Sequence, residues 1–407
     1  MQHVIIGSGA AGMAAAKTIR EIDPTARITV IAEDDTVYSR CMLHHYISGE
    51  RTDAEMSFVR DDFFDEYNVN QVAGQTVKTI DTANKIVHYS GGSVVYSKLL
   101  IATGSNSFIP PVGALRDAKN VYGLRHLSDA ASIKEKAAES KSAVVIGAGL
   151  VGLDAAYSLL QIGLEVHVVE IAERVLALNL DERAAEQYRK KFEEAGCVFH
   201  LGQKAADTIC DNGFVAALAL DDGSTIDCDM VVVAVGVRSA VGFLEGSSIK
   251  MEKSIIVDEH METNIKGVYA AGDVTGLSGI WPNAAMQGIV AARNMCGQEE
   301  VYSDSFAAKN TINFFDLVTL SVGKTDPDAN DGVEVLEDRS NYKKAILTGD
   351  TVSGVILQGD ISNSGHWQHI IKNKIPIDPT RRKSKRSVFN ISFADYFKID
   401  AEGNYAW

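Results

Sequence analysis

Two stretches of the chain repeat one order of apolar and polar positions. Each predicts a short buried strand, then a helix, then a second strand that ends beside an acidic residue. These elements are expected at Gln2–Ile6, Met13–Ile22 and Arg27–Ala32, and again at Ser142–Ile146, Leu153–Gln161 and Glu165–Val169. Two βαβ units with unlike flanking sequences indicate two domains of one type, so the fold class is α/β with two Rossmann-like domains.

The segments outside these units add smaller elements. The polar region 72–96 is hairpin-like, with Gly91-Gly92 as its expected turn. Ile109-Pro-Pro-Val112 marks a domain boundary, because consecutive prolines continue neither a helix nor a sheet ladder. Residues 306–376 combine strand-like runs with one helix, expected at Trp367–Lys374, and predict a C-terminal α+β domain.

Three glycines lie between strand and helix in each unit. In the first unit, Gly7, Gly9 and Gly12 allow the backbone to approach a pyrophosphate, and the next helix directs its positive end at the phosphate charge. Glu33, about 20 residues beyond the last glycine, is placed to accept hydrogen bonds from both ribose hydroxyls. A complete βαβ unit with the acid in place predicts an adenine dinucleotide site, not a merely structural turn.

Gly147, Gly149, Gly152 and Glu170 form the same pattern in the second unit. Two dinucleotide sites on one chain suggest a flavin and a nicotinamide. Glu170 would repel a 2′-phosphate, and no arginine follows it until Arg174, so we expect NADH in preference to NADPH. The alternative is that Arg174 folds back and receives the phosphate.

Composition narrows the partners and the compartment. The formal charge of −15 argues against nucleic acid, because phosphate binding needs a broad basic face. The cysteines are few and include no C-x-x-C pair, which suits a reducing cytosol and supplies neither a zinc nor an iron-sulfur ligand set, so no metal site is expected. The apolar runs are shorter than the roughly 18 to 20 residues of a membrane helix, and the first strand begins at the initiator Met. We therefore expect a soluble, cytoplasmic protein.

Three further strings carry a family resemblance. They are Leu99-Leu-Ile-Ala-Thr-Gly-Ser105, Val233-Ala-Val-Gly-Val-Arg238 and Thr263-Asn-Ile-Lys-Gly-Val-Tyr-Ala-Ala-Gly-Asp273. With them, the chain resembles the flavoprotein disulfide reductase superfamily along nearly its whole length. The resemblance implies FAD in the first domain, with Asp273 bonded to its ribityl chain, and a nicotinamide dinucleotide in the second. It also implies that the helix beginning in Trp281–Gly288 directs its positive end at the flavin.

The resemblance and the motifs together define the expected domains and cofactor contacts. The FAD-binding domain is expected at 1–112 and 243–305, the NAD(P)H-binding domain at 113–242, the C-terminal α+β domain at 306–376 and a tail at 377–407. The expected cofactor-binding residues are Gly7, Gly9, Ala10, Ala11, Gly12, Glu33, Arg40, Ala102, Thr103, Gly104, Gly147, Gly149, Val151, Gly152, Glu170, Gly236, Gly272, Asp273 and Ala284.

One branch of the superfamily is the closer likeness. It contains the reductase part of NAD(P)H nitrite reductases, NADH:rubredoxin reductases and oxygenase-coupled ferredoxin reductases. Tyr38-Ser-Arg-Cys-Met-Leu43 and Gly354-Val-Ile-Leu-Gln-Gly-Asp360 are similar to that branch. The resemblance implies an FAD-dependent NAD(P)H oxidoreductase that passes electrons from NADH to a rubredoxin, a ferredoxin or an iron-sulfur subunit. The alternatives are a Cys41-dependent disulfide or persulfide reductase, an NADH oxidase, and an electron-relay subunit of a larger complex.

Cys41 departs from the glutathione-reductase type of site, which needs two close cysteines. Beside a flavin, this thiol could form a mixed disulfide or a sulfenate; the alternative is a small packing residue. Ala10 stands where NADH oxidases and peroxidases of the superfamily usually carry a His, which counts against peroxide chemistry. The other cysteines are expected in the core; they are Cys197, Cys210, Cys228 and Cys296.

His45 and Asp154 are a second candidate catalytic pair. Some ferredoxin reductases place a Lys near the flavin, paired with an acid from the second glycine helix. By this resemblance His45 and Asp154 could form the corresponding pair, and a protonated His45 could relay a proton. The alternative is that His44 and His45 are solvated surface groups.

The C-terminal tail is first basic and then aromatic. Arg381-Arg-Lys-Ser-Lys-Arg386 is either a solvated segment or a docking patch for an acidic electron carrier or partner subunit. The aromatic residues of the tail are expected to pack on this chain or on a partner, in a homodimer or a hetero-complex. They are Phe389, Phe393, Tyr396, Phe397, Tyr405 and Trp407.

Overall fold

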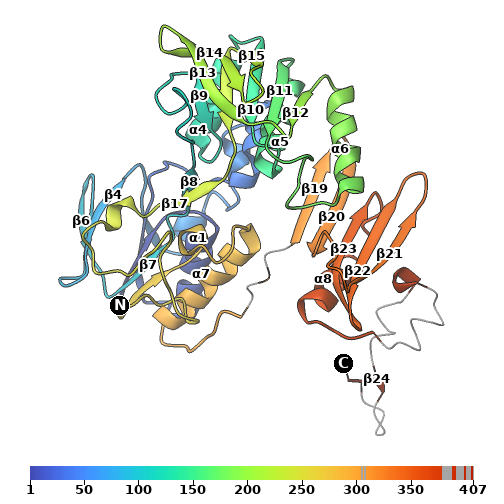
Figure 1. The fold of residues 1–407 in the computed structure, drawn as a ribbon. Coiled ribbons are helices and arrows are strands. Elements are labelled where there is room, and N and C mark those ends of the chain that lie inside the picture. The colour runs from blue at the N-terminus through green and yellow to red at the C-terminus, as the bar shows by residue number, and fades with distance from the viewer. Residues whose placement is uncertain (304–305, 307–308, 378–386, 391–397, 400–404, 407) are drawn as a thin grey trace. The chain divides into compact units, whose positions relative to one another are not determined.

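The computed structural model describes residues 1–303, 306, 309–377, 387–390, 398–399 and 405–406. The chain divides into two compact units (Figure 1). The first unit comprises Met1–Pro110, Tyr122–Glu139 and Val235–Ala307, and the second comprises Pro111–Val121, Ser140–Ala234 and Ala308–Trp407. Residues 122–139 thus group with the first unit, whereas the sequence placed them with the second domain, and the chain returns to the first unit at Val235, before the expected residue 243.

A parallel sheet in the order β18-β7-β1-β2-β3 forms the centre of the first unit. Leu99, Leu100 and Ile101 are each 0% exposed, which is typical of a parallel strand covered on both faces. The strands are β1 (Gln2–Ile6), β2 (Arg27–Ile31), β3 (Val69–Val72), β7 (Lys98–Ile101) and β18 (Val268–Ala270).

Helices cover one face of this sheet and a small antiparallel sheet covers the other. Helices α1 (Ala10–Ile22) and α7 (Trp281–Met295) pack closely, since a Cβ on Gly288 would lie 2.1 Å from the Ala11 carbonyl oxygen. The small sheet contains β4 (Val77–Asp81), β5 (Ile86–Tyr89) and β6 (Gly92–Val95). Its second turn is Ser90-Gly91, because Tyr89 pairs with Gly92, so the expected Gly91-Gly92 turn is shifted by one residue.

Shorter strands and helical segments complete the first unit. Strands β8 (Ser105–Ser107) and β17 (Val237–Ser239) pair antiparallel and join two segments that are distant in sequence. The helical segments are η1 (Arg40–Met42), α2 (Leu43–Ile47), η2 (Ala54–Met56), α3 (Phe63–Glu66), α4 (Leu127–Ala137), η3 (Gly242–Leu244) and η4 (Asp273–Thr275).

The second unit contains the second Rossmann-like sheet, in the order β12-β11-β10-β16-β9. Its strands are β10 (Ser142–Ile146), β11 (Glu165–Glu170), β12 (Val198–Leu201), β16 (Met230–Val233) and the edge strand β9 (Val121–Gly123), which begins at the last residue of its segment in this unit; helix α5 is at Leu150–Gln161. An antiparallel sheet accompanies it, made of β13 (Ala205–Asp211), β14 (Phe214–Leu220) and β15 (Thr225–Asp227). Helices α1 and α5 both begin three residues before the sequence placed them, because each starts directly after its N-cap glycine, Gly9 or Gly149.

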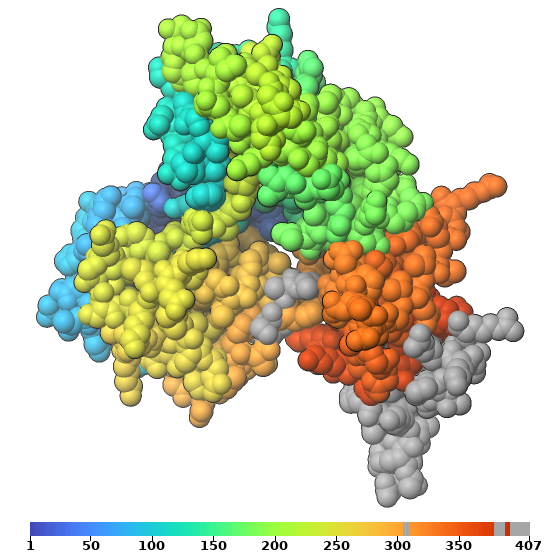
Figure 2. Space-filling model, in the orientation of Figure 1, coloured from blue at the N-terminus to red at the C-terminus, as the bar shows by residue number. Residues whose placement is uncertain are grey.

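The C-terminal domain also belongs to the second unit. Its antiparallel sheet has the order β19-β20-β23-β22-β21, and helix α8 (Ser364–Lys372) packs on β20 and β23. The strands are β19 (Lys309–Phe314), β20 (Leu317–Gly323), β21 (Gly332–Glu337), β22 (Tyr342–Thr348) and β23 (Thr351–Gln358). Helix α6 (Glu182–Glu194) lies against this sheet, and in the space-filling view its green surface meets the orange surface of the sheet (Figures 1 and 2).

The tail is described only in part. The basic run 381–386 and Phe393, Tyr396, Phe397 and Trp407 lie outside the described residues. Phe389 in η5 (Val388–Asn390) packs on this chain, with its ring centroid 5.6 Å from that of Trp367. Two short strands follow, β24 (Lys398–Ile399) and β25 (Tyr405–Ala406). Among the described residues, no helix has both the length and the apolar character needed to cross a membrane.

The expectation that the four remaining cysteines fill the core is partly wrong. Cys197 and Cys228 are buried, and burial raises the pKa of each thiol to about 12. Cys296 is half-buried, and Cys210 is exposed. Cys210 lies in β13, most of whose side chains face solvent, so its strand context did not imply burial.

Candidate functional site

The first glycine turn is built so that side chains are excluded from most of it. Gly7 has φ +108°, and a Cβ there would lie 2.2 Å from the Ala102 carbonyl oxygen. A Cβ on Gly12 would lie 2.0 Å from the carbonyl oxygen of Gly7. Gly9 differs, because a Cβ there would meet no protein atom within 4 Å. The open space at the N-cap of α1 therefore fits a pyrophosphate, which the free N–H groups of the first turn can bind.

The other expected residues of the first unit line the same end of the sheet. Ala10 and Ala11 are buried in the first turn of α1, and Glu33 is exposed just after β2. Thr103 donates its hydroxyl to the Ala240 carbonyl at 2.9 Å. Gly104 has φ +70° and accepts the backbone N–H of Ala240 at 3.0 Å. The segment after β7 is thus fixed in place by the segment after β17.

Asp273 forms an ion pair that the sequence did not predict. Its carboxylate accepts a hydrogen bond from the Ser105 hydroxyl at 3.0 Å and a short one from the Arg125 guanidinium. The Arg125 and Asp273 side chains are 22% and 15% exposed, and burial lowers the pKa of Arg125. Arg125 lies between two expected motifs, 148 positions from Asp273, and no glycine string marks it. Only evidence that these two residues are in contact, which their local sequences do not carry, would have revealed the ion pair.

Arg40 extends this network of charged groups. Its guanidinium donates to the Arg125 carbonyl at 2.8 Å and to the Tyr38 hydroxyl at 3.0 Å, and it pairs with Asp34 at 3.3 Å. Burial raises the pKa of Tyr38 to about 12, so this hydroxyl stays protonated at neutral pH. Each arginine is thus paired with a carboxylate, and the network holds Arg40 and Arg125 in place through charge-assisted hydrogen bonds.

The N-terminal part of α7 brings a buried amide to the same region. Gln287 is 0% exposed, and its Oε1 accepts the Gly272 N–H at 2.8 Å. Its Nε2 is buried and has no hydrogen-bond acceptor among the described residues. Ala284 is 8% exposed and would lie 3.7 Å from a Cβ on Gly272. A buried donor without a protein partner fits a position that a ligand completes.

Cys41 lies on η1, and His44 and His45 lie on α2. Cys41 is exposed, and in its thiolate form it would favour the charged form of Arg125. Burial lowers the pKa of His44 to about 4, so this imidazole is neutral at physiological pH. His45 Nδ1 lies 2.5 Å from Glu50 Oε2. Within the first unit, then, the carboxylate partner of His45 is Glu50, whereas the expected partner Asp154 lies in the second unit.

The second glycine turn repeats the geometry of the first. Gly147 has φ +107°, and a Cβ on Gly152 would lie 1.9 Å from the Gly147 carbonyl oxygen. Gly149 is the N-cap of α5 and again leaves open space where its Cβ would be. Val151, in the first helical turn, is 42% exposed. This turn fits the pyrophosphate of a second dinucleotide.

The acid at the end of β11 is fixed by backbone groups. Glu170 accepts the N–H of Ala148 at 2.7 Å and the N–H of Ala172 at 2.9 Å. Arg174 does not fold back onto Glu170. Instead its Nη2 lies 2.7 Å from Oδ2 of Asp326, in the C-terminal domain.

Asp154 in α5 and Gly236 complete the expected residues. Burial raises the pKa of Asp154 to about 7, so this carboxyl is partly protonated at neutral pH. Gly236, assigned to the second domain, belongs to the first unit, where it has φ +113° and its carbonyl accepts the Phe108 N–H at 2.9 Å.

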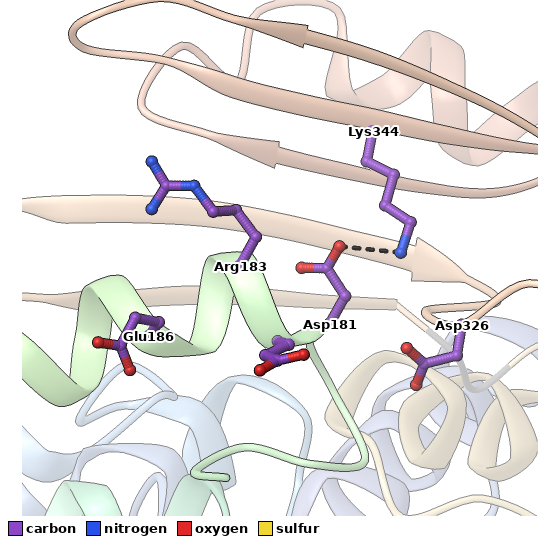
Figure 3. Close-up of a pocket in the computed structure, with 6 residues that line it drawn as sticks. Asp181, Arg183, Glu186, Asp326 and Lys344 are labelled. Atoms are coloured by element: carbon purple, nitrogen blue, oxygen red, sulfur yellow. Dashed lines mark hydrogen bonds and ion pairs between the residues drawn. The ribbon is translucent and has the colours of Figure 1, made fainter.

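A surface pocket of about 490 Å³ lies elsewhere in the second unit, between α6 and the C-terminal sheet (Figure 3). Its lining is charged and includes none of the expected site residues. It consists of Asp181, Glu182, Arg183, Glu186, Asp326 and Lys344. Lys344 reaches from the sheet to Asp181 at the start of α6, with Nζ 2.8 Å from Oδ2.

Two family models match the chain. Residues 1–288 match the pyridine nucleotide-disulphide oxidoreductase model, and residues 309–375 match the rubredoxin NAD+ reductase C-terminal domain. The two matched regions correspond to the two dinucleotide-type sheets and to the C-terminal sheet.

Individual proteins are similar over nearly the whole chain. The NADH-dependent phenylglyoxylate dehydrogenase subunit epsilon of Aromatoleum evansii is 32% identical over 397 residues, covering 94% of each chain. The nitrite reductase [NAD(P)H] of Bacillus subtilis is 29% identical and matches 94% of this chain, which spans about half of that protein, 48% of its length. An NAD-dependent persulfide reductase of A. fulgidus has a similar structure, with a TM-score of 0.82, 26% identity, and 93% and 78% of the two chains covered.

Proposed function

Because the chain belongs to the pyridine nucleotide-disulphide oxidoreductase family, it is an FAD-dependent NAD(P)H oxidoreductase, and we propose that NADH is its electron donor and an iron-sulfur or rubredoxin-type protein its acceptor. When bound, FAD supplies the chemistry that takes up a hydride and gives out electrons. The chain supplies the two glycine turns, the Arg125–Asp273 pair and the α7 N-terminus that would hold and orient the cofactors.

The C-terminal domain is the observation that carries the choice of acceptor. Residues 309–375 match the C-terminal domain of rubredoxin NAD+ reductases. This chain spans about half of the length of the nitrite reductase relative. The match to the C-terminal domain therefore supports a rubredoxin-type protein as the acceptor.

The preference for NADH is supported by two contacts of the second unit. The Glu170 carboxylate is held by two backbone N–H groups. In that position it would accept hydrogen bonds from the ribose hydroxyls of NADH and repel the 2′-phosphate of NADPH. Arg174, the nearest following arginine, is paired with Asp326 and not with a group at the ribose position.

Anaerobic reduction of the purified flavoprotein tests this function. We expect NADH to bleach the flavin absorbance faster than NADPH, and the reduced protein to reduce rubredoxin or a [2Fe–2S] ferredoxin faster than disulfides or oxygen. A C41S variant should retain most of its acceptor reduction, because the proposed route does not use the thiol. Loss of nearly all turnover in C41S would contradict the proposal.

A disulfide or persulfide reductase that uses Cys41 is the second candidate. It is supported by the exposure of Cys41 and by the nearby positive charge of Arg125, which would stabilise a thiolate. This function predicts that full reduction consumes about two equivalents of NADH per subunit, one for the flavin and one for an oxidised sulfur. A titration that ends at one equivalent would exclude it.

An electron-relay subunit is a variant of the first function. The Aromatoleum evansii relative, whose alignment covers 94% of its own length and 94% of this chain, is named as the epsilon subunit of a dehydrogenase. If this chain works in the same way, it should copurify with partner subunits from its native source. It should do so at a salt concentration that dissociates weak, transient complexes. Recovery of a single-chain species that reduces a free acceptor protein would favour a stand-alone reductase.

A further inference from the structure

Arg174 is restrained by three acceptors, none of which is Glu170. Its Nη2 pairs with Asp326 at 2.7 Å and donates to the Ala177 carbonyl at 3.3 Å, and its Nε donates to the Leu180 carbonyl at 3.3 Å. Its side chain is 32% exposed. The guanidinium is thus tied to its own loop and to the C-terminal domain.

Asp326 lies on a loop that is itself held in position. It follows β20, and the carbonyl of its neighbour Thr325 accepts Lys344 Nζ at 2.9 Å. Lys344 is 7% exposed and is fixed by Asp181, as Figure 3 shows. The same loop is braced by Lys324, whose Nζ lies 2.6 Å from Asp328 Oδ2 and pairs with a second aspartate nearby. The buried Lys344 therefore fixes the loop that places the Asp326 carboxylate beside Arg174.

The loop between β11 and α6 is anchored by buried apolar side chains and by the C-terminal sheet. Three of its apolar side chains are buried, Val175, Leu176 and Leu180. Asn179 and Asp181 join it to the C-terminal sheet, since the Asn179 carbonyl accepts the Ser321 hydroxyl at 2.5 Å and Asp181 binds Lys344. The backbone around Arg174 is thus fixed, and its guanidinium is directed at Asp326.

A 2′-phosphate on the adenosine ribose needs a cationic partner where NADH presents a hydroxyl. Between Glu170 and Asp181 the sequence contains one cationic residue, Arg174. We propose that Asp326 is a specificity-determining residue, which withholds Arg174 from a 2′-phosphate and so adds to the discrimination that Glu170 provides. This inference rests on the proposed NADH preference and assigns part of it to the C-terminal domain.

Calorimetric titration with two redox-inert probes tests the inference. Adenosine 2′,5′-bisphosphate carries the 2′-phosphate and 5′-AMP lacks it, so the ratio of their affinities reports this subsite alone. In an E170A background, D326N should raise the ratio about twofold to fivefold, the range that an exposed ion pair of up to roughly 1 kcal/mol permits. Adding R174A should remove the gain, because the released cation would be absent. E170Q serves as the background if E170A fails to fold.

The matched control is E337Q. Glu337 pairs with Arg183 and also joins α6 to the C-terminal sheet, but it does not contact Arg174. E337Q should leave the affinity ratio unchanged. The inference would be overturned if D326N did not change the affinity ratio, or if the increase in the ratio persisted when R174A was added. In either case AMP binding and NADH oxidation would remain intact. If the unmodified protein binds neither AMP nor NADH, the proposed function fails and the inference fails with it.

Discussion

At the residue scale, the glycines of each turn have different tasks. Gly152 makes room for the protein's own backbone, since a Cβ there would lie 1.9 Å from a carbonyl oxygen. Gly149 makes room for no protein atom, and its φ of −76° is open to any residue. The space at Gly149 is therefore open to a ligand, and the same holds for Gly9 in the first turn.

This difference predicts that one alanine substitution weakens NADH binding and that the other lowers the stability of the second unit. G149A should fold normally and keep its FAD, while the added methyl group obstructs the pyrophosphate and weakens NADH binding roughly tenfold or more, about 1.4 kcal/mol. G152A should lower the stability of the second unit instead, because backbone atoms must shift. Titration calorimetry with NADH and urea unfolding measure the two effects. Unchanged NADH affinity in G149A would contradict the assignment of this turn.

The Arg125–Asp273 pair makes a second prediction. R125A leaves a half-buried carboxylate without its cationic partner, which costs less than the roughly 3 to 5 kcal/mol of a fully buried pair. Because we propose that this carboxylate binds FAD, the flavin-to-protein ratio after gel filtration should fall. R60A is the control, since Arg60 is 67% exposed in its own ion pairs. Equal flavin content in both variants would show that Arg125 does not support the FAD site.

Buried histidines predict how stability depends on pH. His3 is 1% exposed, and burial, followed by the nearby amino terminus, lowers its pKa from 6.5 to about 4. Because the folded state disfavours the charged form, its contribution is fully present above pH 6.5 and is lost as the pH falls through 4, by at most about 3 kcal/mol. H3Q should flatten the fall in urea midpoint between pH 6.5 and 4.5. An unchanged slope would assign the acid sensitivity to other groups, such as His44.

At the element scale, helix α6 and the C-terminal sheet are joined by buried polar contacts. Asp181 caps the helix by accepting the Ala184 N–H at 3.0 Å, and its other oxygen accepts the Tyr342 hydroxyl and the Lys344 ammonium. Tyr188 of the same helix donates to the Leu317 carbonyl at 2.7 Å. The C-terminal domain is therefore tied to the nucleotide-type sheet within the second unit.

Substitution of Asp181 should loosen this connection. D181A removes the helix cap, worth about 1 kcal/mol, and leaves the buried Lys344 unpaired, which costs roughly 3 to 5 kcal/mol. The urea midpoint of the second unit should fall clearly, whereas E337Q, which breaks an exposed pair, should change it by no more than about 0.5 kcal/mol. A D181A variant as stable as E337Q would show that the buried network does not join the two elements.

The elements near the glycine turns could be predicted from sequence, because strand, turn and helix there are set by local patterns. The site around Asp273 could be predicted only in part. Arg125 reaches Asp273 through a segment, 122–139, that returns to the first unit, and no local pattern reveals such a return. The engagement of Arg174 by Asp326 depends in the same way on contact between residues 152 positions apart.

At the scale of the whole molecule, one chain carries two dinucleotide-type sheets and a C-terminal sheet, with a glycine turn in each compact unit. We propose that FAD binds at the turn beside Asp273 and the nicotinamide dinucleotide at the turn beside Glu170. The electron acceptor is the third component of the reaction. The match of the C-terminal domain supports an acceptor that is itself a protein.

The proposed path of electrons is tested most directly by an anaerobic titration of the purified flavoprotein with NADH, followed by addition of oxidised rubredoxin or [2Fe–2S] ferredoxin. We expect full bleaching of the flavin at about one equivalent of NADH per subunit, and rapid return of the flavin absorbance as the iron-sulfur or rubredoxin protein is reduced. An end point at two equivalents, with reoxidation by disulfides or persulfides and not by either protein, would contradict it.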